Sequence, residues 1–184
     1  MVNQGPKGYC VPATWERVMR YMGIPADMYV LAMAGGTEAG GGTSTQDIAW
    51  AVKSAVAGAG RRMDSPSLKL TPEGVAKFID EGLPIMWAMV STAEFNAAAD
   101  ARMGPRKAMA DPESWAASLE LARKAAKDWP DDPEAGHVCM IIGYNEKTGE
   151  LAVSDSWGPQ FAERWVTAEE AQMVSQGRFY VIGL

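Results

Sequence analysis

The segment HVCMIIGYNEKTGELAVSDSWG (residues 137–158) contains two apolar runs separated by a polar turn. The runs cover 137–144 and 151–155, and Gly149 lies near the end of the turn, as in an antiparallel hairpin. Partner numbers in such a hairpin add up to a constant, here about 292–295, so His137 faces a residue between 155 and 158. This register brings the imidazole and the Asp155 carboxylate to the same end of the hairpin.

Apolar periodicity and cap residues predict further elements on both sides of this hairpin. Helices precede an antiparallel sheet along the chain, which indicates an α+β fold with an N-terminal helical part packed on a C-terminal antiparallel β-sheet. The predicted helices cover 12–22, 26–34, a segment opened by a capping box of Thr43 and Gln46, 71–82, and a short stretch capped by Thr167 and Glu170. The remaining predicted strands cover 84–90, 163–166 and 179–182.

We expect residues 1–184 to form a single domain, because 184 residues favour one hydrophobic core. Residues 91–135 are rich in alanine, charge and proline, and Asp111-Pro112 begins a helix directed towards Asp128. We interpret 91–135 as a helical insertion packed on the core, in preference to a lid. Residues 35–42 form a glycine-rich loop without the lysine and the preceding strand of a phosphate-binding loop, so we predict flexible backbone there.

Composition excludes several classes of protein. Apolar residues make up 47% and charged residues 22% of the chain, which is typical of a globular protein rather than a disordered or fibrous one. The longest apolar runs are too short for a membrane-spanning segment. The net charge is −6 and the basic residues form no stripe, so we expect no nucleic-acid partner. Without a CxxC pair we expect no zinc, and no cofactor is indicated. We identify no signal peptide; a cytoplasmic location and export after removal of a leader both stay open, as does the oligomeric state.

The two cysteines have different surroundings. Cys10 lies just before Pro12 at the predicted start of a helix, where unpaired N–H groups and the helix dipole favour a thiolate. Cys139 lies within a predicted strand among apolar residues, which is typical of an inert buried thiol. A disulfide between the two is arithmetically allowed but disfavoured. His137 is the only histidine in the sequence, so any chemistry that needs an imidazole must use it.

Three separated motifs together resemble the papain-like cysteine peptidases. They are QGPKGYC at 4–10, GHV at 136–138 and DSWG at 155–158. That family has a glutamine six residues before its cysteine, and a histidine and an amide or acid far downstream. The 127 residues from Cys10 to His137 are slightly fewer than the family's usual ~130–150. Asp155 and the run CVPAT at 10–14 are similar to the bacterial branch of bacteriocin-leader-processing peptidases and their stand-alone relatives.

The resemblance implies a role for each matching residue in the hydrolysis of a peptide or protein substrate. Cys10 is the nucleophile, and His137 is the general base and then the general acid. Asp155 orients the imidazole, and the Gln4 side chain donates to the oxyanion. Trp157 shields the histidine–aspartate hydrogen bond from water.

Other functions on the same fold stay open at this point. If an amine instead of water resolves the thioester, the site is an acyl or peptidyl transferase that resembles phytochelatin synthase. A non-catalytic peptide-binding module is a further alternative. Resemblances to transglutaminases and arylamine acetyltransferases require a much shorter gap between cysteine and histidine. Val11 replaces a glycine found in many relatives and Tyr9 precedes the nucleophile, so the shape of the cleft is not predicted.

Overall fold

The computed structural model describes residues 2–5, 8–37, 42–130 and 132–184, so half of the glycine-rich stretch 35–42 lies outside the described residues. The described part contains an antiparallel sheet with the strand order β1-β6-β2-β3-β4-β5. The strands are β1 (Arg62–Asp64), β2 (Ile85–Val90), β3 (Gly136–Asn145), β4 (Glu150–Ser154), β5 (Arg164–Thr167) and β6 (Ser175–Gly183). The α-helices are α1 (Cys10–Tyr21), α2 (Met28–Ala34), α3 (Thr45–Gly58), α4 (Pro72–Ile79), α5 (Ala93–Lys107), α6 (Pro112–Ser118), α7 (Glu120–Ala125) and α8 (Ala168–Val174). Within these described ranges, no helix is both long and apolar enough to cross a bilayer.

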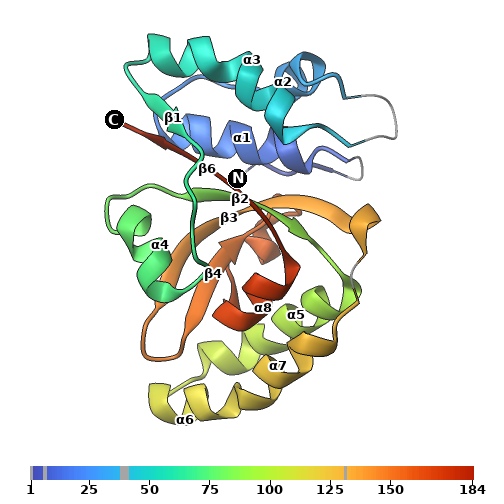
Figure 1. Cartoon of the computed structure of the whole chain (residues 1–184), viewed down its shortest axis with the longest axis vertical. Helices are drawn as coiled ribbons and strands as arrows, with labels where there is room; N and C mark the ends of the chain where they lie inside the picture. The colour runs from blue at the N-terminus through green and yellow to red at the C-terminus, as the bar shows by residue number, and fades with distance from the viewer. Residues whose placement is uncertain (1, 6–7, 38–41, 131) are drawn as a thin grey trace.

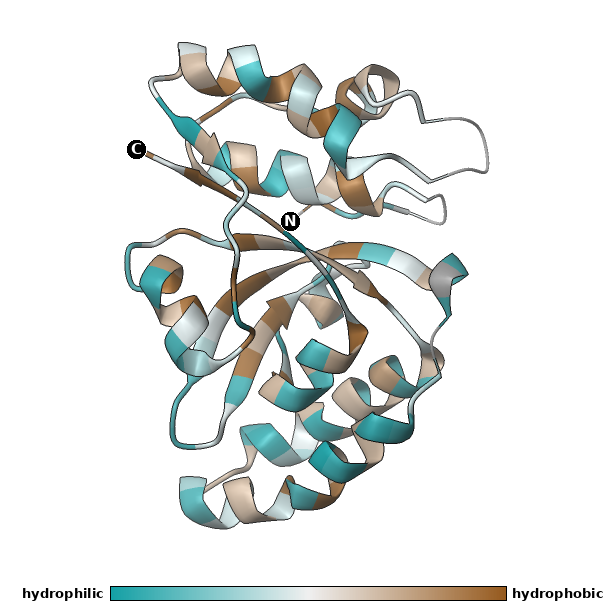
Figure 2. Cartoon of the chain, in the orientation of Figure 1, coloured by the Kyte–Doolittle hydropathy of each residue, from teal (hydrophilic) through white to brown (hydrophobic). Residues whose placement is uncertain are grey.

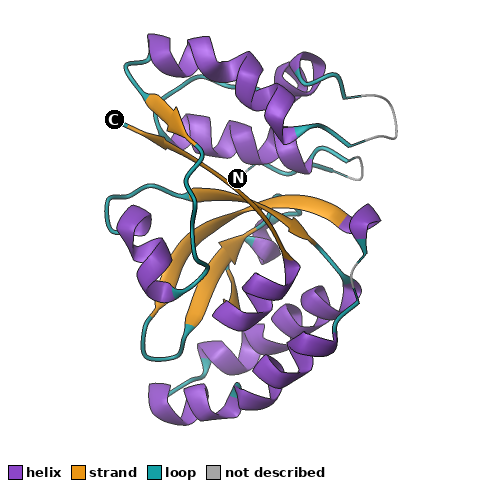
Figure 3. Cartoon of the chain, viewed as in Figure 1, coloured by secondary structure: helices purple, strands orange, loops and turns teal. Residues whose placement is uncertain are grey.

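Helices cover both faces of this sheet (Figures 1 and 3). Side chains of β2 alternate between two separate cores, as the period of a strand requires. Met86 and Ala88 pack with α1, α2 and α3, whereas Trp87 and Met89 pack with α4, α5 and α8. The apolar residues of the strands lie between these two helical layers (Figure 2). The predicted α+β architecture is therefore confirmed, with the addition that helices also cover the face opposite the N-terminal helices.

The hairpin of β3 and β4 has the predicted register. Met140 pairs with Ser154 and Tyr144 with Leu151, so the partner numbers sum to 294 or 295 on either side of one register shift. The turn uses Gly149 at φ +67°, a conformation that glycine adopts without steric cost. The start of β3 and the end of β4 consequently lie at one edge of the sheet.

Local signals placed most other elements correctly. The capping box of Thr167 and Glu170 is present at the start of α8. The predicted box of Thr43 and Gln46 is wrong, because Ser44 caps α3 by accepting from the amide of Asp47. β1 was not predicted, since it has only three residues and no apolar alternation. α5 was not predicted either, since Pro105 lies within it and only Phe95 and Ala99 are buried.

Buried ion pairs attach segment 91–135 to α8 and to the sheet. Arg102 of α5 donates twice to Glu170 of α8, at 2.8 and 2.5 Å, and the Glu170 side chain is fully buried. Arg106 pairs with Glu150 of β4 at 3.2 Å. The predicted helix after Asp111 is interrupted at Leu119, which separates α6 from α7. These contacts support an insertion packed on the core.

We predict that Arg102→Met destabilises the fold by about 3 kcal/mol, because it leaves the buried Glu170 carboxylate without its cation. Urea unfolding followed by circular dichroism measures this change. The matched control is Arg62→Met, which removes the exposed pair with Asp64 and should cost less than about 1 kcal/mol. Equal effects of the two substitutions would show that the Arg102 pair does not stabilise the attachment of α5.

Candidate active site

Cys10 is held beside the start of β3 by the helix that it begins. It is the first residue of α1, and its side chain is partly buried against the core on that face. One turn further on, the fully buried Thr14 hydroxyl donates to the carbonyl of Val138 at 3.0 Å. Since Val138 follows His137 in β3, this bond fixes the helix start against the strand start. The thiol and the imidazole are thereby in hydrogen-bond contact.

His137 lies between the thiol and a buried carboxylate. Its Nε2 is 2.6 Å from Oδ1 of Asp155, and both side chains are buried. The other ring nitrogen, Nδ1, is therefore the one available to the Cys10 sulfur. Burial disfavours the imidazolium, but hydrogen bonds and charge from Asp155 and Cys10 outweigh burial and raise the pKa of His137 to about 9.

The same contacts favour the thiolate form of Cys10. Burial raises the pKa of a thiol, but the hydrogen bond and the positive charge of His137 outweigh it. Backbone groups of Val138 and Val11 act in the same direction, and the pKa of Cys10 lies below its usual value. The pair therefore favours a thiolate beside an imidazolium, which is the reactive state of a cysteine nucleophile.

A buried arginine holds the far side of Asp155, and sequence reasoning did not identify it. Arg164 of β5 donates to Oδ2 of Asp155 at 2.6 Å, and both side chains are 1% exposed. Arg164 also donates to Asp100 at 3.0 Å and to Asn96 at 3.1 Å, both on α5. Burial would raise the pKa of Asp155, but His137 and Arg164 lower it overall, so the carboxylate stays charged. A lone arginine in a short strand gives no signal in the sequence, because only the paired register places it opposite Val153 and next to Asp155.

The remaining predicted residues lie at the same edge of the sheet. The backbone N–H of Gln4 donates to the carbonyl of Ser156 at 2.8 Å, and the Ser156 hydroxyl donates to Oε1 of the Gln4 side chain at 2.8 Å. Ser156 follows Asp155 directly, so these bonds tie the N-terminal segment to the chain that follows β4. Trp157 stacks on His137 with ring centroids 4.6 Å apart and covers one face of the imidazole.

Cys139 lies in a different environment from Cys10. Its side chain is 1% exposed and packs in the core on the α4, α5 and α8 face, whereas Cys10 packs against the opposite core. Burial raises the pKa of Cys139 well above its usual value. Both cysteines are free thiols. Among the described residues, no group of three or more acidic, cysteine or histidine side chains could hold a metal ion.

Comparisons with known proteins agree on one family. The model of the Peptidase_C39 like family matches residues 1–181. The peptidase domain of Streptococcus ComA, a bifunctional ABC transporter of a quorum-sensing pathway, has a similar structure with a TM-score of 0.58 and 14% identity, covering 99% of this chain and 96% of that one. A protein from Bacillus anthracis described as C39-like has a TM-score of 0.62 and 12% identity, covering 100% and 94%. These likenesses confirm the papain-like fold. A search of curated sequences found no match.

We predict that iodoacetamide near pH 6 alkylates Cys10 at least tenfold faster than Cys139, because an ordinary thiol with a pKa of about 8.5 is almost fully protonated there. Peptide mass spectrometry after timed quenching measures both rates in one sample. In His137→Ala, the rate of Cys10 alkylation near pH 6 should be far lower than in the wild type. When the pH is raised towards about 9, this rate should increase, because a thiol without the imidazole ionises in that range. Unchanged labelling of Cys10 in that variant would contradict the role of the imidazole.

Proposed function

Because this chain belongs to the Peptidase_C39 like family, we propose that it is a cysteine peptidase that hydrolyses amide bonds through Cys10, His137 and Asp155. One observation carries the proposal: the thiol contacts the imidazole, whose other nitrogen is bound to a buried carboxylate. This order of groups is what a nucleophile, its base and an orienting residue require. Both thiol and imidazole are shifted towards their charged forms at neutral pH.

In the first step, the Cys10 thiolate attacks the carbonyl carbon of the scissile amide and forms a tetrahedral intermediate. The negative charge develops on the carbonyl oxygen, where the backbone amide of Cys10 and the side-chain amide of Gln4 donate. Each such donor typically lowers the barrier by roughly 3 kcal/mol. The bonds between Ser156 and Gln4 support this role, because they fix the backbone and side chain of Gln4 next to Asp155.

In the second step, the imidazolium of His137 gives its proton to the leaving amine, and a thioester remains on Cys10. The imidazole then takes a proton from water, which attacks the thioester and releases the acid product. Asp155 holds the ring through Nε2 during both proton transfers. Arg164 is a positioning residue that keeps the Asp155 carboxylate charged and fixed.

A peptide-library assay with mass-spectrometric detection tests the proposal. Cleavage products that gain one water, present in the wild type and absent in Cys10→Ala, are the expected result. Cys139→Ala is the matched control and should keep its activity, since that thiol is buried in the core against Met89 and does not contact the imidazole. Products that gain an amine would instead assign a transferase. Peptides that bind but are never cleaved would assign a binding module and overturn the proposal.

We predict that Asp155→Asn lowers kcat by roughly a hundredfold with a small effect on KM, because acid–base catalysis needs an oriented imidazole. The raised pKa of His137 depends on the Asp155 charge, so the proton of the imidazolium is lost at lower pH in this variant. Activity of the wild type should therefore decline as the pH rises through about 9, and the decline in Asp155→Asn should begin at lower pH. A change confined to KM would contradict the orienting role.

A further inference from the structure

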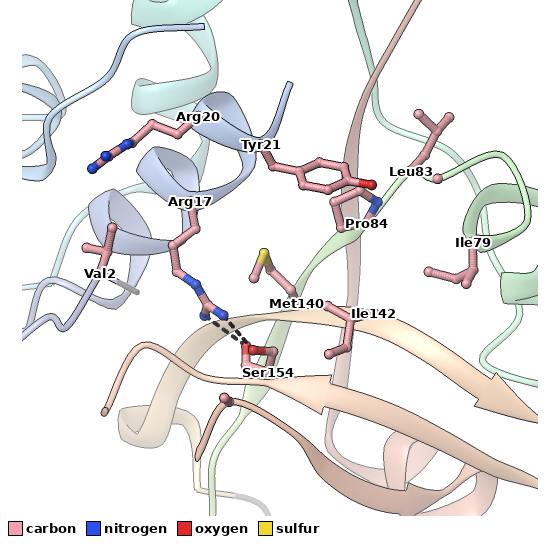
Figure 4. Close-up of a pocket in the computed structure, with 12 residues that line it drawn as sticks. Val2, Arg17, Arg20, Tyr21, Ile79, Leu83, Pro84, Met140, Ile142 and Ser154 are labelled. Carbon is pink, nitrogen blue, oxygen red and sulfur yellow. Dashed lines mark hydrogen bonds between the residues drawn. The ribbon is translucent and has the colours of Figure 1, made fainter. Parts of the chain in front are cut away.

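A cavity of about 750 Å³ opens between the C-terminal half of α1 and the sheet (Figure 4). One side is apolar and is formed by Ile79, Leu83, Pro84, Met140 and Ile142. Its size lies within the range of small-molecule sites in proteins, ~300–1,000 Å³. Among the described residues that line it, none belongs to the Cys10, His137 and Asp155 cluster.

The other side of the cavity is cationic. Arg17 is half-buried and donates to the carbonyl and the hydroxyl of Ser154, at 3.3 and 2.5 Å (Figure 4). A guanidinium has five N–H donors, so these two bonds leave three. Arg17 has no ion pair within the described part of the chain, and none of the described lining residues is acidic. Arg20 also lines the cavity but is paired with Glu16 at 2.9 Å.

Burial lowers the pKa of Arg17 overall, although the nearby charge of Asp155 opposes this, so an anion in direct contact would stabilise the guanidinium further. We propose that this cavity binds a small carboxylate with an apolar chain, with the carboxylate on Arg17 and the chain on Met140, Ile142 and Leu83. A charge-assisted pair with the planar guanidinium fixes the orientation of the ligand, and the apolar side supplies the buried surface. A fatty acid and the free C-terminus of a short apolar peptide share this chemistry.

Calorimetric titration of the folded protein with decanoate, below the concentration at which it forms micelles, tests the proposal. Saturable binding is expected, with at least tenfold weaker binding of decanol, because the alcohol lacks the charge that Arg17 pairs with. Acetyl-dileucine with a free carboxylate, compared with its amide, tests the peptide source in the same way. Tighter binding of one of the two carboxylates identifies the source.

Matched variants separate the two halves of the site. Arg17→Met should weaken decanoate about tenfold and leave decanol unchanged. Ile142→Asn, at a partly exposed position in β3, should weaken both ligands, whereas Met173→Asn on the exposed side of α8 should weaken neither. Circular dichroism confirms folding of each variant.

Cys10→Ala should bind decanoate as the wild type does, so the result is independent of any activity of the thiol. Equal affinity of each carboxylate and its uncharged counterpart for the wild type, or no saturable binding of either carboxylate, would overturn the proposal even if Arg17→Met failed to fold.

Discussion

The charged forms of His137 and Cys10 depend on the buried carboxylate of Asp155. An isolated carboxylate at 1% exposure would be neutralised by protonation, because burial strongly disfavours its charged form. His137 and Arg164, each 2.6 Å from one of its oxygens, together lower the pKa of Asp155 and keep it ionised. The ionised carboxylate in turn stabilises the imidazolium of His137, and the imidazolium stabilises the thiolate of Cys10. The lowered pKa of the Cys10 thiol therefore depends, through His137, on the charge of Asp155.

This alternation of charge also gives segment 91–135 a physical role. α5 places Asn96 and Asp100 on the solvent side of Arg164, and the Asp100 side chain is 46% exposed. The series of opposite charges thus begins near solvent at Asp100 and ends at the sulfur of Cys10. The ion pairs that α5 makes with Glu150 and Glu170 hold it in the position from which it reaches Arg164. The segment therefore supports the site through Arg164, which α5 contacts and which in turn holds Asp155.

The sequence predicted what depends on local pattern and on hairpin register. The apolar runs and the turn around Gly149 predicted the pairing of β3 with β4, and that register brings His137 to Asp155. Arg164 was not predictable in this way, because a charged residue in a four-residue strand is most often solvent-exposed and only the fold places it in a core. The capping error at Thr43 has a similar cause. Adjacent hydroxyl residues compete for the cap, and the buried position of Thr43 beside Thr37 leaves Ser44 to cap the helix.

Two arginines, Arg17 of α1 and Arg164 of β5, donate to residues at the end of β4. Successive residues of a strand point to opposite faces, so Ser154 is directed to α1 and Asp155 to the core on the other side. Arg164 forms ion pairs with two carboxylates, those of Asp155 and Asp100. Arg17 is half-buried and donates only to the neutral oxygens of Ser154, and the Asp155 charge acts on it without a direct ion pair. The fold thus neutralises one guanidinium with its own residues and leaves the other with donors directed at an apolar cavity, where a carboxylate would complete the same pattern of charge.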